Sequence, residues 1–88
     1  SQFDAKVDEY NTLRTNLLND KQSVKLAEQS FRLSQNKFKT GKVSVTDLNN
    51  NEALLTQAKL THALHQYQLA ESLATIRKLV SYQAGETK

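Results

Sequence analysis

The chain has 88 residues, of which 38% are hydrophobic and 24% charged, with no cysteine, no proline and a formal net charge of +3. This length allows one domain at most, and the lack of cysteine excludes disulfides and thiolate metal sites. No apolar run approaches the roughly 20 residues that cross a bilayer, and the N-terminus lacks the apolar segment of a signal peptide. We therefore expect a piece of a larger protein or a mature soluble fragment.

A heptad repeat runs through the first half of the chain. Large apolar residues recur every seven positions, at Phe3, Tyr10, Leu17, Val24, Phe31 and Phe38. This repeat predicts a coiled-coil helix from residue 2 to about residue 40. A first set of companion positions lies three residues after the heptad residues and includes Leu13, Ala27 and Ser34. A second set lies two residues after them and includes Ala5, Leu26 and Leu33. Small residues in the first set favour close helix approach, and the second set widens the apolar stripe beyond one seam.

A helix end is predicted at the only glycine in the body of the chain, Gly41, since Gly85 lies near the end. Lys37 and Lys39 put positive charge where the last turn of a helix attracts it. Glycine takes the left-handed conformation that ends many helices without a side-chain penalty. The first helix is therefore expected to stop near Thr40.

A helix start follows directly. Ser44 and Asp47 have the spacing of a capping box, in which each side chain accepts a hydrogen bond from the backbone N–H of the other residue. Val43 and Leu48 have the spacing of the hydrophobic staple that often accompanies such a cap. The second helix is therefore expected to begin near Val45.

The second helix carries two apolar stripes. One contains Leu48, Leu55, His62, Leu69 and Ile76, and the other contains Ala53, Leu60, Tyr67 and Ala74. Two stripes predict contact with more than one neighbouring helix. Between residues 49 and 70, only Glu52 and Lys59 carry fixed charge. Such a neutral polar face is typical of a wall around a confined aqueous space, and equally of a plain solvated face.

Together these signals predict an all-α fold, a long antiparallel two-helix coiled-coil hairpin. We expect a single hairpin over residues 1–88, with helices at about 2–40 and 45–84 and a turn at 41–44. Helices of this length make a rod of about 55 to 60 Å. Because two helices bury only a thin seam, the isolated hairpin is expected to self-associate into a homodimer, in which the four helices form one bundle.

The search for catalytic groups favours a protein that is not an enzyme and holds no cofactor or metal. His62 and His65 have a spacing that can present two imidazoles to one metal, but no third ligand matches them on that helix. Asp8 and Glu9 point in different directions on a helix, and Asp4 and Asp8 form a like-charge pair on an exposed face. No glycine-rich phosphate loop is present.

The residues from 27 to 85 resemble the periplasmic helical hairpin of TolC-like outer membrane efflux proteins. The resemblance rests on an aromatic residue three positions before Gly41, the run from Ser44 to Leu48, and Ala58 ten residues later. Downstream, it continues through Tyr67, Ala70, Leu73, Leu79 and Gly85.

This resemblance implies a role in transport. Members of that family are homotrimers anchored in the outer membrane, and two such hairpins per protomer build a helical tube across the periplasm for efflux or type I secretion. The hairpin tips close the aperture and meet the hairpin of a periplasmic adaptor protein. By position, the resemblance places Asp47 at an acidic aperture position and the adaptor-docking tip at Thr40, Gly41, Lys42, Val43 and Ser44.

Two other readings remain open. The α-hairpin of the adaptor protein itself shares this length and heptad pattern, and it carries an Arg-Leu-Ser set at its tip. Here Arg32, Leu33 and Ser34 occur about two helical turns before Gly41. A nucleic-acid-binding arm, like the helical hairpin of seryl-tRNA synthetases, is the alternative of another class. Basic residues from Lys21 to Lys42 are opposed only by Glu28, but the second helix is almost uncharged, so we expect no nucleic-acid partner.

Overall fold

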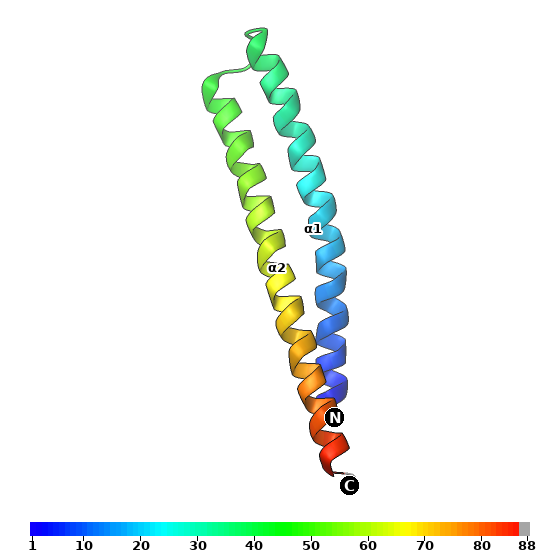
Figure 1. Ribbon diagram of the computed structural model, residues 1–88. Helices are drawn as coiled ribbons and strands as arrows, with labels where there is room; N and C mark the ends of the chain where they lie inside the picture. Colours follow the sequence, from blue (N-terminus) through cyan, green and yellow to red (C-terminus); the bar gives the residue numbers. More distant parts are fainter. Residues whose placement is uncertain (87–88) are drawn as a thin grey trace.

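Two long antiparallel helices form the whole described structure, a computed structural model that describes residues 1–86 (Figure 1). Helix α1 spans Gln2–Lys39 and helix α2 spans Val45–Glu86. The predicted all-α hairpin is therefore confirmed. The rod measures 71 × 14 × 14 Å, longer than the expected length, because α2 has 42 residues and continues past the start of α1 (Figure 1).

The helix limits lie within one or two residues of the expected positions, a difference typical of helix ends. The first helix begins after Ser1, whose Oγ accepts a hydrogen bond from the N–H of Asp4 at 3.3 Å. It ends at Lys39 rather than Thr40, because the N–H of Thr40 already bonds to the carbonyl of Lys37, three residues back. The second helix runs on to Glu86 and includes Gly85.

The seam between the helices is thin. The α1 heptad residues Phe3 to Phe31 are half-buried, as is the first α2 stripe from Leu48 to Ile76, whereas Phe38 is 40% exposed. Among the residues whose burial is described, no hydrophobic side chain is fully buried, and the two buried residues are Ser34 and Ser72. Each helix has one neighbour, so most of its surface meets solvent.

Companion positions complete the seam. The α1 set contains Leu13, Ala27 and Ser34, as the small-residue pattern predicted, together with Asp20. On α2, the half-buried or buried counterparts lie three residues after each residue of the first stripe, at Asn51, Ala58, His65, Ser72 and Leu79. Several of these residues are polar, so the seam alternates apolar layers with polar or small ones.

Most of the remaining apolar residues point away from the seam. Ala5, Leu26 and Leu33 of α1 are exposed. The second α2 stripe is also exposed, with Leu60 at 70% and Tyr67 at 64%. The two stripes of α2 therefore lie on different faces, and only the first contacts α1.

Candidate functional site

Backbone hydrogen bonds close the end of α1 at the turn. Gly41 has a φ of 73°, in the left-handed region that favours glycine. Its N–H donates to the carbonyl of Phe38 at 3.0 Å, and the N–H of Lys42 donates to the carbonyl of Lys37 at 2.8 Å. This pair of bonds is the Schellman motif. The hydroxyl of Thr40 also donates to the Lys37 carbonyl, at 3.0 Å. The end of α1 is therefore fixed by its own backbone.

The capping box is formed at the start of α2. The N–H of Asp47 donates to Ser44 Oγ at 3.1 Å, and the N–H of Ser44 donates to Asp47 Oδ2 at 3.4 Å. Val43 and Leu48, the staple pair, are both half-buried although their neighbours are exposed. Two independent motifs thus fix the two sides of the turn.

Removal of the cap should be measurable. Ser44→Ala removes the acceptor for the Asp47 N–H, so we expect a loss of about 1 kcal/mol in the free energy of unfolding. Asp47→Asn is the matched control, because its amide oxygen still accepts from Ser44, and it should cost clearly less. Urea unfolding followed by circular dichroism measures both. Equal stability of Ser44→Ala and the unmodified chain would contradict a capping role.

The predicted docking tip is an exposed, basic surface. Thr40, Gly41, Lys42 and Ser44 are exposed, and Val43 is half-buried. A hollow of about 400 Å³ beside the turn is lined by Val43, Asp47 and residues of both helices. Lysines cluster near it, at Lys37, Lys39 and Lys42. This arrangement can recognise a partner by backbone and side-chain hydrogen bonds and by charge.

The two histidines have different surroundings in the seam. His65 Nδ1 forms a hydrogen bond with Asp20 Oδ2 across the helices, whereas His62 Nδ1 is buried without a partner. In the part of the chain that the structure describes, no group of three or more His, Cys, Asp or Glu side chains could hold a metal ion. Asp20 was missed as a seam residue, although it shares the heptad position of Leu13 and Ala27.

A second polar contact crosses the seam nearer the turn. Asn51 Nδ2 donates a hydrogen bond to Ser34 Oγ. This contact and the Asp20 to His65 contact are separated by fourteen residues on both helices, 20 to 34 on α1 and 51 to 65 on α2. Both contacts therefore form in the same alignment of α1 with α2. A slip by one heptad would break both, so they specify how the helices align.

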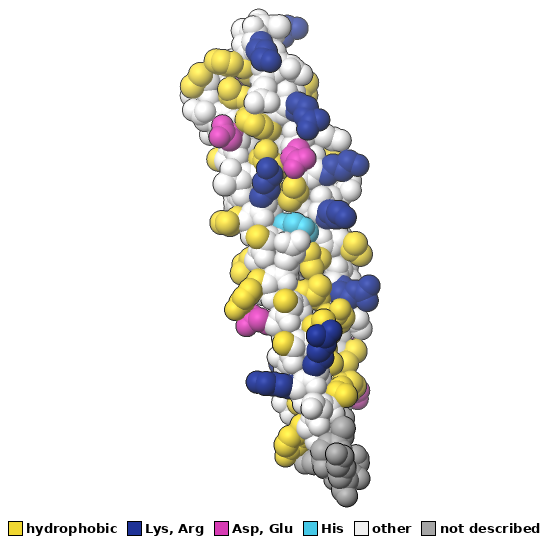
Figure 2. Space-filling view, viewed as in Figure 1, with side chains coloured by type: hydrophobic (Ala, Val, Ile, Leu, Met, Phe, Trp, Pro, Cys, Tyr) yellow, Lys and Arg dark blue, Asp and Glu magenta, His cyan; other side chains and the backbone are white. Residues whose placement is uncertain are grey.

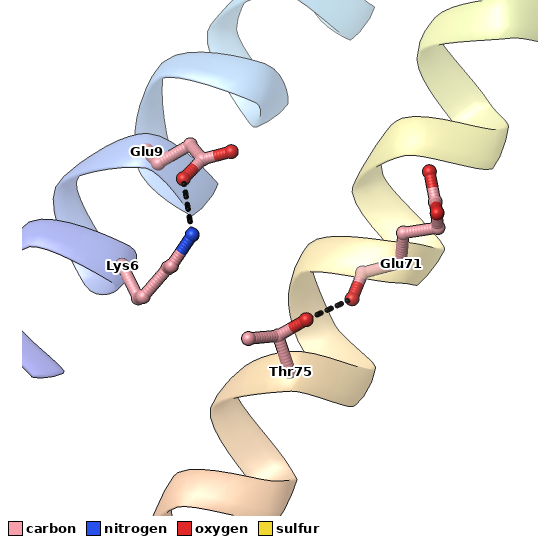
Figure 3. Close-up of polar contacts among 4 residues, drawn as sticks. All are labelled: Lys6, Glu9, Glu71 and Thr75. Carbon is pink, nitrogen blue, oxygen red and sulfur yellow. Dashed lines mark hydrogen bonds and ion pairs between the residues drawn. The ribbon is translucent and has the colours of Figure 1, made fainter.

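The end of the rod opposite the turn holds another polar hollow, of about 410 Å³. Lys6 Nζ lies 3.4 Å from Glu9 Oε2 on α1, and Thr75 Oγ1 donates to the backbone carbonyl of Glu71 on α2 at 3.0 Å (Figure 3). Ser72, 7% exposed, lines the same hollow, and its Oγ has no hydrogen-bond partner. At this end, the polar contacts that the described residues form stay within one helix, so the half-buried apolar residues such as Tyr10, Leu13 and Ile76 hold the two helices together.

The two sides of the seam differ in charge. The basic flank consists of Arg14, Leu18, Lys21, Lys25 and Arg32 of α1 with Lys59, His62 and Gln66 of α2. The neutral flank consists of Ser23, Ser30 and Leu33 of α1 with Leu54, Gln57 and Thr61 of α2. In the face shown in Figure 2, dark blue Lys and Arg side chains follow one another along the α1 side. The sequence showed the basic run, but the side of the seam on which it lies follows from the helix pairing.

Comparison of the chain with family models, with curated proteins and with solved structures finds no match. Neither helix, over the described residues, is apolar along enough of its length to cross a membrane. The shape of the rod, its turn and its exposed faces are therefore the features that indicate its function.

Proposed function

We propose that this hairpin is a periplasmic wall segment and docking tip of a trimeric outer membrane channel for efflux or type I secretion. The observation that supports the proposal most is the second stripe of α2. Leu60 and Tyr67 are 70% and 64% exposed, on a face that α1 does not cover. A tube wall needs helices that pack against more than one neighbour, and an isolated hairpin leaves such a face open.

In this role the hairpin has no chemistry of its own, and it is not an enzyme. The parent chain is a homotrimer anchored in the outer membrane of a Gram-negative cell, and the hairpin is its periplasmic portion. The energy for transport comes from a pump that an adaptor protein links to the tip. Asp47 combines its helix cap with a charge that helps to hold the aperture closed.

The tip is tested by adaptor binding. Val43→Asp places a charge on the half-buried residue of the turn, and Gly41→Glu puts a side chain on a residue with positive φ. We expect each to weaken binding to an adaptor hairpin by at least about tenfold, the size of a contact worth about 1.4 kcal/mol. Isothermal titration calorimetry measures the affinity, and circular dichroism verifies that the helices persist.

Gln22→Asp is the matched control, because it adds the same charge to an exposed position of α1 far from the turn. Its affinity should stay within about twofold of the unmodified chain. If Val43→Asp binds as well as Gln22→Asp, the turn is not the docking surface. A salt-steep affinity for RNA with no adaptor binding would favour the nucleic-acid arm instead.

A further inference from the structure

The basic flank has a regular spacing of charge. Arg14 and Lys21 are one heptad apart, as are Lys25 and Arg32, so each pair is separated by about 10.5 Å along the helix. The side chains of all four are exposed, and no ion pair is found for them among the described residues. Lys59 adds a positive charge from α2, seven residues before Gln66.

Two acids, Glu28 and Glu52, share the heptad positions of Lys21 and Lys59 and lie nearer the turn. The positive charge is therefore concentrated in the middle of the flank, between Arg14 and Lys25. Over the same length, the charged residue that lines the neutral flank is Asp20, which is half-buried and paired with His65, so the exposed part of this flank can pack against a second copy. The two sides of the rod thus suit different partners.

The spacing favours a helical partner over a nucleic acid. Measured along the axis of a duplex, the phosphates of one strand are spaced at about 3.4 Å, so charges about 10.5 Å apart along a rod parallel to that axis would match only about one phosphate in three. A partner helix with one carboxylate per heptad has the same repeat as this flank. Each basic residue of a heptad pair would then face one acid.

A groove in the middle of the flank supplies an apolar contact. It has a volume of about 330 Å³ and lies between Arg14 and Lys21. Leu17, Leu18 and Leu69 form its apolar lining, and His62 and Gln66 form its polar edge. Leu18 is 71% exposed, so its side chain is available to a partner. A groove of this size has room for one apolar side chain of a partner, and acids on either side of that side chain would reach the two cations.

We infer that the basic flank binds an acidic amphipathic helix of another protein, with an apolar side chain of that helix in the Leu17–Leu18–Leu69 groove and carboxylates on Arg14 and Lys21. This surface is distinct from the turn, and the inference does not depend on the channel proposal. The flank then selects its partner by charge, and the groove sets the register of the two helices.

The test uses the full chain and a labelled synthetic peptide of about four heptads, with one leucine per heptad between glutamates. Fluorescence anisotropy measures binding. Arg14→Gln with Lys21→Gln should weaken the affinity by at least about tenfold, and Leu18→Ser should weaken it by at least about threefold with no change of charge. The control Lys37→Gln with Lys78→Gln removes the same charge outside this flank and should change the affinity by less than about twofold.

All substituted side chains are exposed, so the variants are expected to keep the helicity that circular dichroism reports. If the two double variants lose the same amount of affinity, the peptide responds only to the net charge of the chain, and the inference is wrong. Equal binding of a peptide with lysine in place of glutamate would also overturn it. A duplex oligonucleotide that binds more tightly than the peptide and displaces it would assign the flank to nucleic acid instead. If Leu18→Ser binds the peptide as tightly as the unmodified chain, the groove is not part of the interface.

Discussion

Asp20→Leu should destabilise the hairpin by about 1 to 3 kcal/mol, although leucine suits a coiled-coil seam better than aspartate. The cost comes from His65, which is 24% exposed at its side chain and loses the partner that satisfies its Nδ1. The Asp20 side chain is 16% exposed, so solvent screens part of the interaction and the effect stays below that of a fully buried pair. Urea unfolding at one fixed protein concentration measures the loss.

The double variant Asp20→Leu with His65→Leu should recover most of this stability, to within about 1 kcal/mol of the unmodified chain or above it. Asp8→Leu is the control, because Asp8 is an exposed aspartate of the same helix, and it should change the stability by no more than about 0.5 kcal/mol. If Asp20→Leu alone stabilises the hairpin, His65 does not depend on Asp20.

Self-association through the neutral flank is the second large effect. Leu33 and Leu54 are 54% and 59% exposed, and the exposed side chains along the middle of this flank are uncharged. Burial of a leucine contributes about 1.5 to 3 kcal/mol, so Leu33→Lys with Leu54→Lys should raise the dimer dissociation constant by at least about 100-fold. Sedimentation equilibrium of the unmodified chain is expected to show a homodimer, and the variant a monomer.

Leu18→Lys is the matched control for that experiment. Leu18 is the most exposed of the large hydrophobic residues described, at 71%, but it lies on the basic flank, where the dimer is not expected to form. It should leave the dissociation constant within about threefold of the unmodified value. A monodisperse monomer of the unmodified chain at high concentration would contradict the dimer, and equal effects of both variants would place the interface elsewhere.

The turn was the easiest part to predict from sequence. The turn residues from Gly41 to Asp47 form hydrogen bonds with residues three to five positions away, so the chain order already contains their partners. The structure shows these bonds at 2.8 to 3.4 Å. The end of α2 was expected near residue 84, but the helix continues through Gly85 to Glu86. Glycine can adopt helical backbone angles as well as left-handed ones, so its presence alone does not fix a helix end.

The seam was predictable in part. Large apolar residues at Phe3 to Phe31 identify one side of it, because burial of apolar area selects that face. Asp20 and His65 were not recognised, since a polar residue at a heptad position is typical both of a solvated face and of an interhelical hydrogen bond. Whether such a residue forms an interhelical hydrogen bond depends on which residue of the other helix lies opposite it. That residue is known only once the alignment of the two helices is known.

The two helices, the site of their reversal and the apolar stripe that pairs them could all be predicted from the sequence, because they depend on local hydrogen bonds and on a period of seven. The folded hairpin was needed to show which residues meet across the seam and on which side of it each exposed residue lies. The pairing of Asp20 with His65 and of Ser34 with Asn51 fixes one alignment of the helices. That alignment separates Arg14 and Lys21 from Leu33 and Leu54, and gives the rod a basic flank and a neutral one.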